Sequence, residues 1–392
     1  MKQNNTADIV IIGGGIIGCS IAYNLANQGA KNVVVLEKGE LCSGGTAKSC
    51  AITRSHYSIE ANVHHAVESV KIFENFDDMV GGDPRFTCTG QLVLGQEKHR
   101  PVMERVFCTQ NKYGSETQTL TPAEAAKLHP LLQFEDVDVI GFESRSGYCD
   151  PYLTTIAYAK RAKDLGVKFY TGTPVTGIRI NGVNKTIETR RSDFECSTLI
   201  LAAGPWTHNL GKMLGIKFPY EISKHKVLTL KIDIPYEKDW PIVKDLLTPE
   251  KIYFRPDAGG VVLVGTGDQG DPVNNVEEMT NDVEMEHIER IGKLMANRMP
   301  AFAEAKLVRS WTGPYDIPPD WNPIIGPVPK LEGVHVAVGF SGHGFKLAPT
   351  IGESLAQQIL GTNPRVPIDM YDMTRFETGK TLNGAYGIGT FA

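Results

Sequence analysis

Six residues near the N-terminus have the types and spacing of a phosphate-binding turn. The segment Gly13–Gly18 reads G-x-G-x-x-G, follows a short apolar run and opens a helical pattern, and Glu37 ends the next apolar run. In such a turn the first glycine permits the tight bend, the second lets the backbone approach a pyrophosphate, and the third lets helix and strand pack closely. The helix N-terminus would face the phosphates and the carboxylate would accept hydrogen bonds from a ribose diol. We therefore predict a dinucleotide site that includes Gly13, Gly15, Ile16, Ile17, Gly18 and Glu37.

Two later segments favour FAD over NAD as the dinucleotide. Glycine residues follow apolar runs again in Thr198–Trp206 (TLILAAGPW) and in Gly339–Gly344 (GFSGHG). In the second segment a strand leads through a glycine loop into a helix. Late returns of this kind suit a long cofactor buried across the whole domain, and a carboxylate at Glu37 disfavours NADP because it would repel a 2′-phosphate. An NAD-dependent dehydrogenase, and a glycine-rich turn without ligand, are the alternatives.

The elements that must position these turns form a discontinuous α/β domain. Short apolar runs near residues 10, 34, 200 and 336 read as buried parallel strands, and the segments 16–28, 151–165 and 344–360 read as helices. Alternating runs at 226–234 and a hairpin pattern at 251–265 indicate a second, mainly antiparallel part. We predict an α/β and α+β protein with a Rossmann-like dinucleotide-binding domain (1–80, 140–220 and 325–392) and an interleaved, mainly antiparallel substrate-binding domain (81–139 and 221–324).

Composition excludes several classes of protein. The 392 residues are 41% hydrophobic and 22% charged, with a net charge of −5, so there is no electrostatic argument for nucleic acid. The seven cysteines include no CxxC pair, which argues against a disulfide framework and a zinc site and favours a reducing cytoplasm. The sequence shows no signal-peptide pattern and no apolar stretch long enough to span a membrane. No metal site is expected.

Several motifs in register resemble the D-amino-acid oxidase-like flavoproteins, specifically the branch of the sarcosine oxidases (monomeric and β subunit) and the sarcosine and dimethylglycine dehydrogenases. The motifs are DIVIIGGGIIG…VVVLEKGELCSGGTAKS, TLILAAGPW and WTGPYDIPPDWNPIIGP…GFSGHGFKLAPTIGE, which together span residues 8–353. The resemblance implies an FAD-binding Rossmann-like domain with an antiparallel substrate domain. It also implies transfer of a hydride equivalent from a C–H bond beside an amine nitrogen to flavin N5, giving an imine that hydrolyses.

The resemblance also implies how a substrate would be held. Sarcosine oxidases bind the substrate carboxylate with an arginine and a lysine, which match Arg54 in CAITRSHYS and Lys346 in SGHGFK. Two cations around a small anion fix its orientation through charge-assisted hydrogen bonds. D-amino-acid and glycine oxidases place their arginine after the W-x-G motif, where this chain has Tyr315. His56, Tyr253 and Tyr315 complete the expected catalytic set.

The remaining cofactor contacts are carried over in the same way. They are Lys38, Ser43, Gly45, Thr46, Lys48, Ser49, Val175, Ala203, Gly204, Trp206, Gly342, His343, Gly344, Phe345 and Lys346. Two departures predict non-covalent FAD: Thr46-Ala47-Lys48 lacks the histidine that carries flavin in dimethylglycine dehydrogenases, and residues 311–326 lack the cysteine of monomeric sarcosine oxidases. A third departure from the family pattern concerns the reaction with O₂. Leu263 stands where monomeric oxidases have a lysine that activates oxygen beside the flavin. Lys48 is the candidate to supply this positive charge instead.

The resulting hypothesis is an FAD-dependent amine oxidoreductase that acts on a small N-substituted or cyclic amino acid, such as sarcosine, dimethylglycine or a proline-like compound. Its electron acceptor would be O₂ or another redox carrier, and homo- and hetero-oligomers both stay open. Two alternatives remain. One is an FAD-binding β-type subunit of a hetero-oligomeric amine dehydrogenase, and the other is a flavin-dependent 2-hydroxy acid oxidoreductase, which would need a base facing the hydroxyl.

Overall fold

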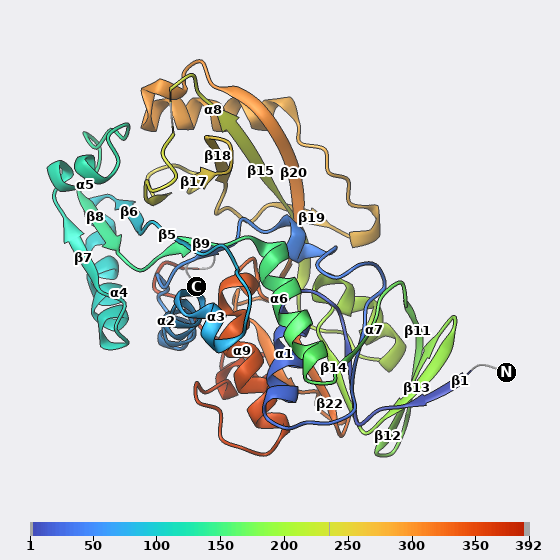
Figure 1. Cartoon of the computed structure of the whole chain (residues 1–392). Coiled ribbons are helices and arrows are strands. Elements are labelled where there is room, and N and C mark those ends of the chain that lie inside the picture. Colours follow the sequence, from blue (N-terminus) through green and yellow to red (C-terminus); the bar gives the residue numbers. More distant parts are fainter. Residues whose placement is uncertain (1–2, 235, 388–392) are drawn as a thin grey trace.

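A six-stranded sheet forms the core of the lower part of the molecule in Figure 1. The computed structural model describes residues 3–234 and 236–387. Five strands of this sheet run parallel and the last pairs antiparallel to its neighbour. In spatial order the strands are β10 (Lys168–Tyr170), β3 (Val33–Leu36), β2 (Ile9–Ile12), β14 (Thr198–Leu201), β22 (Val334–Val338) and β21 (Ile324–Pro327). The four apolar runs therefore share one sheet, as predicted.

Helices from both ends of the chain pack together beside this sheet. The main ones are α1 (Ile16–Asn27), α2 (Glu60–Glu74), α6 (Pro151–Asp164) and α9 (Gly344–Ile359), of which α1 and α9 lie side by side (Figure 1). The Ser20 hydroxyl donates a hydrogen bond to the Ala348 carbonyl oxygen at 2.8 Å. A Cβ at Gly352 would lie 2.2 Å from the Ser20 hydroxyl oxygen, so this approach requires glycine.

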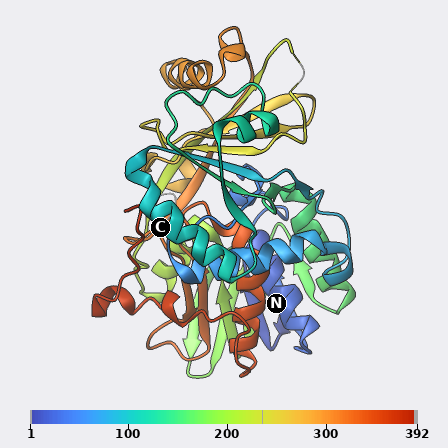
Figure 2. The same ribbon diagram turned by 90° about the vertical axis from the view of Figure 1, so that its left-hand side faces the viewer.

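A nine-stranded sheet forms the second part, which extends from the top of Figure 1 (β15, β17, β18, β20) to its left side (β6, β7, β8); Figure 2 shows the molecule from that side. All of its strand pairs are antiparallel except β16 with β6. The strands are β19 (Asp271–Val273), β15 (Glu221–Lys231), β18 (Val261–Gly265), β17 (Tyr253–Asp257), β16 (Ile242–Asp245), β6 (Gln91–Gly95), β8 (Val139–Glu143), β7 (Thr117–Leu120) and β20 (Lys306–Ile317), which pairs with β15. Its apolar core includes residues of α8 (Met285–Arg298). The predicted fold class is thus confirmed.

Smaller elements complete the structure. A four-stranded sheet consists of β1 (Gln3–Thr6), β13 (Ser192–Cys196), β12 (Asn184–Thr189) and β11 (Val175–Asn181), and a three-stranded one of β4 (Ile52–Thr53), β9 (Gly147–Tyr148) and β5 (Thr87–Cys88). The other α-helices described are α3 (Phe76–Met79), α4 (Arg100–Lys112), α5 (Pro122–Leu128), α7 (Thr207–Leu214) and α10 (Arg375–Thr378). Among the residues described, no helix has the length and apolar character needed to cross a bilayer.

The distribution of strands bears on the proposed domain division. The expected boundary at 139/140 falls inside β8, which pairs with β6 and β7 in the nine-stranded sheet. Cutting that strand would break a continuous ladder of backbone hydrogen bonds, so we propose to place this boundary after residue 143 instead. We keep the two-domain division as a proposal with this change; residues 1, 2, 235 and 388–392 of its ranges lie outside those described.

Candidate active site

A large cavity opens where the parallel strands end. The turns that follow β2, β3, β14 and β22 line it, as the carboxyl ends of parallel strands do in other open α/β sheets. Residues of the nine-stranded sheet line it as well. It encloses about 1810 Å³ of empty space, its open mouth included. The turns of the parallel sheet and the residues of the nine-stranded sheet thus face one common space.

The three glycines of the first turn have different roles. Gly13 has φ +121°, and a Cβ there would lie 2.3 Å from the Ala202 carbonyl oxygen. At Gly18 a Cβ would lie 2.0 Å from the Gly13 carbonyl oxygen, so this residue serves helix–strand packing and does not line the cavity. A Cβ at Gly15 would meet only the Thr46 hydroxyl oxygen, at 3.0 Å. Gly15 is therefore the glycine that keeps the cavity open at the N-terminus of α1.

Glu37 holds the glycine turn from the neighbouring strand. Its two carboxylate oxygens accept hydrogen bonds from the backbone N–H of Gly14, at 2.7 Å, and of Gly39, at 2.8 Å. Because each carboxylate oxygen has two lone pairs, the side chain can also accept a ribose hydroxyl. Glu37 thus combines the predicted ligand contact with a structural one that the sequence did not indicate.

Replacing Glu37 by glutamine is expected to weaken flavin binding by roughly tenfold, because one backbone N–H would then face an amide N–H group. Titration of apoprotein with FAD, followed by fluorescence quenching, measures the dissociation constant. Glu40→Gln is the matched control, since Glu40 is exposed on the same loop. Equal affinity of the two variants would contradict this role of Glu37.

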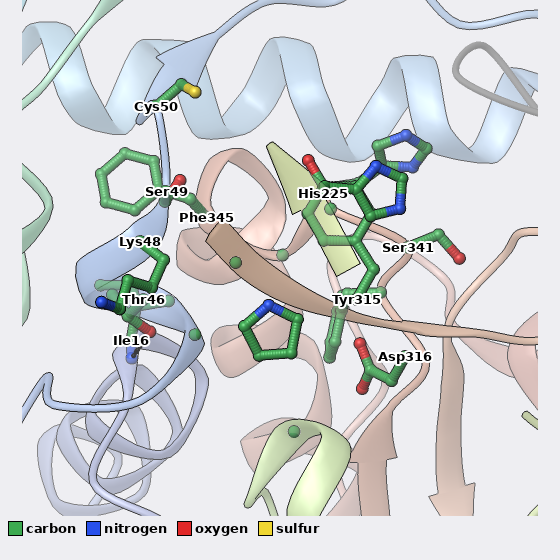
Figure 3. A pocket seen from close by; sticks show the side chains of 18 of the residues that line it. Ile16, Thr46, Lys48, Ser49, Cys50, His225, Tyr315, Asp316, Ser341 and Phe345 are labelled. Carbon is green, nitrogen blue, oxygen red and sulfur yellow. Dashed lines mark hydrogen bonds between the residues drawn. The ribbon is translucent and has the colours of Figure 1, made fainter. Parts of the chain in front are cut away.

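The segment after β3 forms one side of the cavity. Figure 3 shows Ile16, Thr46 and Lys48 on this side, facing Tyr315 and Asp316 on the other. The Thr46 hydroxyl accepts a hydrogen bond from the Ile16 backbone N–H at 3.1 Å. Trp311 donates its indole N–H to the Lys48 carbonyl oxygen at 3.1 Å, which ties the segment to β20.

Two buried cations line the same cavity. Arg54 follows β4 and Lys346 lies in the first turn of α9; their side chains are 6% and 8% exposed, and both line the cavity. The guanidinium carbon of Arg54 lies 4.5 Å from the ring centroid of Tyr57. Burial, with the charge of Arg54, holds the pKa of Lys346 well below its ordinary value. An anion bound between the two side chains would relieve both effects.

Aromatic side chains form the wall beside these cations. His225 and Tyr315 stack with their ring centroids 3.7 Å apart (Figure 3). The Ser223 hydroxyl lies 2.7 Å from His225 Nε2, and burial lowers the pKa of His225 to about 4. A Cβ at Gly342 would lie 2.3 Å from the Tyr315 ring, so the glycine loop before α9 fits against this wall. Tyr253 lines the cavity beside Cys50, with its hydroxyl 3.4 Å from that thiol.

Most of the residues expected from the sequence line this one cavity. They are Gly13, Gly15, Ile16, Ile17, Glu37, Lys38, Ser43, Gly45, Thr46, Lys48, Ser49, Arg54, Ala203, Gly204, Trp206, Tyr253, Tyr315, Gly342, His343, Gly344, Phe345 and Lys346. Leu263, which was expected beside the flavin, is buried in β18 and is not part of the lining.

Three expected residues lie elsewhere. Gly18 packs α1 against the sheet, as described above. Val175 begins β11 and packs against the apolar core on that side. His56 is fully buried, with Nδ1 3.4 Å from a Glu143 carboxylate oxygen and Nε2 2.8 Å from the Tyr386 hydroxyl. The structure therefore does not bring the His56 side chain to the cavity, although its backbone carbonyl accepts a hydrogen bond from Arg54.

The sequence did not reveal several polar residues of the lining. Lys244 in β16 and Gln91 in β6 are 3% and 1% exposed, and His225 and Asp268 come from β15 and the loop after β18. His225 stands between two lysines in a strand with alternating residues. Because side chains alternate between the two faces of a strand, this pattern could have placed His225 on the face opposite to the lysines. Lys244 follows an apolar run, which is the signal that could have marked it as buried.

Buried polar atoms in this lining fit a polar ligand such as FAD. Within the described residues, Trp206 Nε1, Ser341 Oγ, His225 Nδ1 and Gln91 Nε2 are buried without a hydrogen-bond partner. Buried polar groups normally have partners, so such atoms around a cavity indicate that a bound molecule supplies them. Together with the N-terminus of α1, where the N-cap residue Gly15 has no side chain to cap the helix, and the open space at Gly15, they form a site that FAD would fill.

Comparisons with known proteins agree with this geometry. The model of the family described as "FAD dependent oxidoreductase" (DAO) matches residues 8–358. The solved structure of L-proline dehydrogenase from P. horikoshii superposes with a TM-score of 0.89 at 30% identity, covering 96% of this chain and 99% of that one.

Two curated relatives are considerably longer than this chain. Human mitochondrial sarcosine dehydrogenase is 27% identical over 96% of this chain and 42% of its own length. The mitochondrial pyruvate dehydrogenase phosphatase regulatory subunit of Mus musculus is 28% identical over 94% of this chain and 43% of its own length. The chain thus spans less than half of each. From the family match and the cavity together, the chain belongs to the DAO family of FAD-dependent oxidoreductases, and non-covalent binding of FAD is typical of this family.

Proposed function

We propose that this protein oxidises the C–N bond of a small secondary or cyclic amino acid whose carboxylate is held between Arg54 and Lys346. The observation that carries the proposal is the presence of these two buried cations in the same cavity as the dinucleotide-binding turns. A carboxylate bound there forms charge-assisted hydrogen bonds and compensates two buried charges at once.

The aromatic wall supports an amine as the reacting group. Tyr253 and Tyr315 present ring surfaces beside the cations, and aromatic faces attract the partial positive charge on an alkylated nitrogen. FAD, when bound, supplies the two-electron acceptor of the reaction. The protein's own contribution is to hold the carboxylate, to orient the C–H bond beside the nitrogen, and to limit water in a largely buried pocket.

The names of two similar proteins support the class of substrate. Sarcosine and L-proline, on which the human relative and the P. horikoshii enzyme act by their names, are both amino acids with a secondary amine. Tyr315, in the position where D-amino-acid oxidases have an arginine, is consistent with a carboxylate held on the side of Arg54 and Lys346 instead.

Anaerobic mixing of the FAD-loaded protein with a panel of substrates tests the proposal. We expect sarcosine or L-proline to bleach the flavin absorption, with D-alanine and L-lactate much slower. Admission of air then shows whether O₂ or another carrier is the acceptor. Bleaching by lactate but by no amine would overturn the proposal in favour of a 2-hydroxy acid, for which the neutral His225 would be the available base. Absence of bleaching by any of these compounds would favour a β-type subunit that needs its partners.

The rate of anaerobic flavin reduction is expected to rise with pH through the pKa of the bound amine, because a protonated nitrogen has no lone pair to support loss of hydride. Burial lowers the pKa of His225 to about 4, so this imidazole stays neutral from mildly acidic to basic pH and cannot produce that rise. Stopped-flow measurements of the reduction rate against pH should therefore give the same midpoint pH for the wild type and for His225→Asn. A flat profile, or a midpoint that moves in the variant, would contradict oxidation of the free amine with no protein base.

A further inference from the structure

A buried polar cluster outside the cavity is joined to the proposed carboxylate clamp. Arg54 donates a hydrogen bond to the backbone carbonyl oxygen of His56, two residues further along the chain. The His56 side chain is fully buried and contacts Glu143 and Tyr386, and none of these three residues lines the cavity. Arg54 thus connects this cluster to the cavity.

The His56 ring is held through both of its nitrogens. Nδ1 lies 3.4 Å from a carboxylate oxygen of Glu143, and Nε2 lies 2.8 Å from the hydroxyl oxygen of Tyr386. Burial lowers the pKa of His56, so the ring is neutral and has one donor and one acceptor. The neighbouring carboxylate favours the proton on Nδ1, which leaves Nε2 as the acceptor. Tyr386 therefore donates its hydroxyl proton to His56.

Glu143, in β8, holds the backbone between Arg54 and His56. Its Oε2 accepts hydrogen bonds from the backbone N–H of Ser55 at 3.0 Å, from the Ser55 hydroxyl at 3.2 Å and from the Ser146 hydroxyl at 2.8 Å. Glu143 is 1% exposed, and hydrogen bonds to a charged group are strong in such an interior. The peptide groups after Arg54 are thus attached to the nine-stranded sheet.

Tyr386 belongs to a segment, residues 380–387, that is attached to both parts of the molecule. Backbone N–H groups of this segment donate to the carboxylate of Asp320, at 3.0 Å, and to the hydroxyl of Ser58, at 2.9 Å. Tyr386 itself packs against an apolar cluster on and beside the nine-stranded sheet, made of Val93, Met103, Phe107, Val139 and Leu246. These contacts keep its hydroxyl at the His56 ring.

The electrostatics also place Tyr386 close to the carboxylate clamp. Burial raises the pKa of the Tyr386 hydroxyl, and the positive charge of Arg54 opposes that rise. The hydroxyl therefore stays protonated and remains a donor at neutral pH. Its position is set by packing and backbone contacts, so it can restrain the His56 ring and, through the His56 carbonyl, the guanidinium group of Arg54.

We infer that Tyr386 is a positioning residue for substrate binding, which acts through His56 on the carboxylate-binding arginine. This inference rests on the carboxylate clamp of the proposed function. The Tyr386 hydroxyl fixes the His56 ring, and the His56 carbonyl oxygen directs the Arg54 guanidinium group. A binding group that is held in its productive orientation by such outer contacts binds its ligand more tightly. Tyr386 takes part in no bond-making or bond-breaking step.

The variant Tyr386→Phe removes the hydroxyl and keeps the ring, so it tests the hydrogen bond to His56. Calorimetry with the FAD-loaded protein measures the dissociation constant of (methylthio)acetate, in which sulfur replaces the amine of sarcosine. We expect binding to be about three- to tenfold weaker, because one hydrogen bond that fixes the arginine is lost. In turnover, KM for the amino acid should rise with little change in kcat. Tyr152→Phe is the control, since Tyr152 is exposed on α6.

A double-mutant cycle separates positioning of Arg54 from a general loss of packing. In the Arg54→Met background, Tyr386→Phe should change the dissociation constant of (methylthio)acetate by less than about twofold, because the group on which it acts is absent. A loss of packing would weaken binding equally in both backgrounds. The thermal midpoint and the affinity for FAD are measured for each variant, and Tyr386→Phe should retain its flavin.

The outcomes distinguish this inference from the proposed function. Weaker binding in Tyr386→Phe that disappears in the Arg54→Met background would support the inference, and it would do so even if no amine reduced the flavin, a result that overturns the proposed oxidation. Unchanged binding in Tyr386→Phe, or equal weakening in both backgrounds, would overturn the inference and leave the proposed function standing. Unchanged binding in Arg54→Met would overturn the carboxylate clamp and the inference with it.

Discussion

Replacement of Arg54 by methionine is expected to lower kcat/KM for the amino acid substrate by roughly 10²–10³-fold. Removing one partner of a buried, hydrogen-bonded charge pair typically costs about 2–5 kcal/mol, and the substrate carboxylate would keep only Lys346. Most of the loss should be in KM, because the carboxylate is bound in the ground state as well as in the transition state. Steady-state kinetics, together with the dissociation constant of a carboxylate inhibitor, measure the effect.

Matched variants separate carboxylate binding from general damage. Arg309→Met is the control, since Arg309 is exposed on β20 away from the cavity. Arg54→Lys should recover part of the lost kcat/KM, because lysine restores the positive charge but not the two parallel N–H donors of a guanidinium group. Arg54→Met should still bind FAD, with an unchanged flavin spectrum. A variant that lost flavin, or that kept a normal KM, would contradict the assignment of Arg54 to the substrate carboxylate.

Replacement of Gly15 by valine is expected to abolish stable flavin binding, with a loss of affinity of at least about 10²-fold. Gly15 has φ −80° and ψ −177°, a conformation that valine adopts readily, so the backbone should tolerate the change. The added methyl groups would extend from the point where the pyrophosphate meets the N-terminus of α1. The flavin content of the purified protein and titration of the apoprotein measure the loss.

Two further glycines show whether the effect is specific. At Gly18 a Cβ would lie 2.0 Å from the Gly13 carbonyl oxygen, so Gly18→Ala should lower the free energy of unfolding by about 1–3 kcal/mol. A Cβ at Gly292 in α8 would meet no atom within 4 Å beyond the backbone of its own helix, and Gly292→Ala should be neutral or slightly stabilising. If Gly15→Val unfolded like Gly18→Ala, or bound FAD like Gly292→Ala, the role of Gly15 in cofactor binding would be wrong.

Local sequence determined the dinucleotide turn and its strands. The spacing of Gly13, Gly15 and Gly18 is set by backbone contacts within one strand–turn–helix unit, so the sequence contains the whole requirement. Fully buried parallel strands also give continuous apolar runs, which is why the four strands near residues 10, 34, 200 and 336 could be recognised and assigned to one sheet. The resemblance to the family motifs also identified Arg54 and Lys346 as candidate site residues, and the structure places both in one cavity.

Only the tertiary structure decided which polar side chains face that cavity. His56 and Arg54 are two residues apart, yet Arg54 lines the cavity while His56 lies in a buried cluster with Glu143 and Tyr386 from distant segments. Lys244 and Gln91 are 153 positions apart in sequence and become neighbours because β16 pairs with β6, the parallel pair of the nine-stranded sheet. Pairing between distant strands depends on the packing of the whole sheet, and no local pattern of residues encodes it.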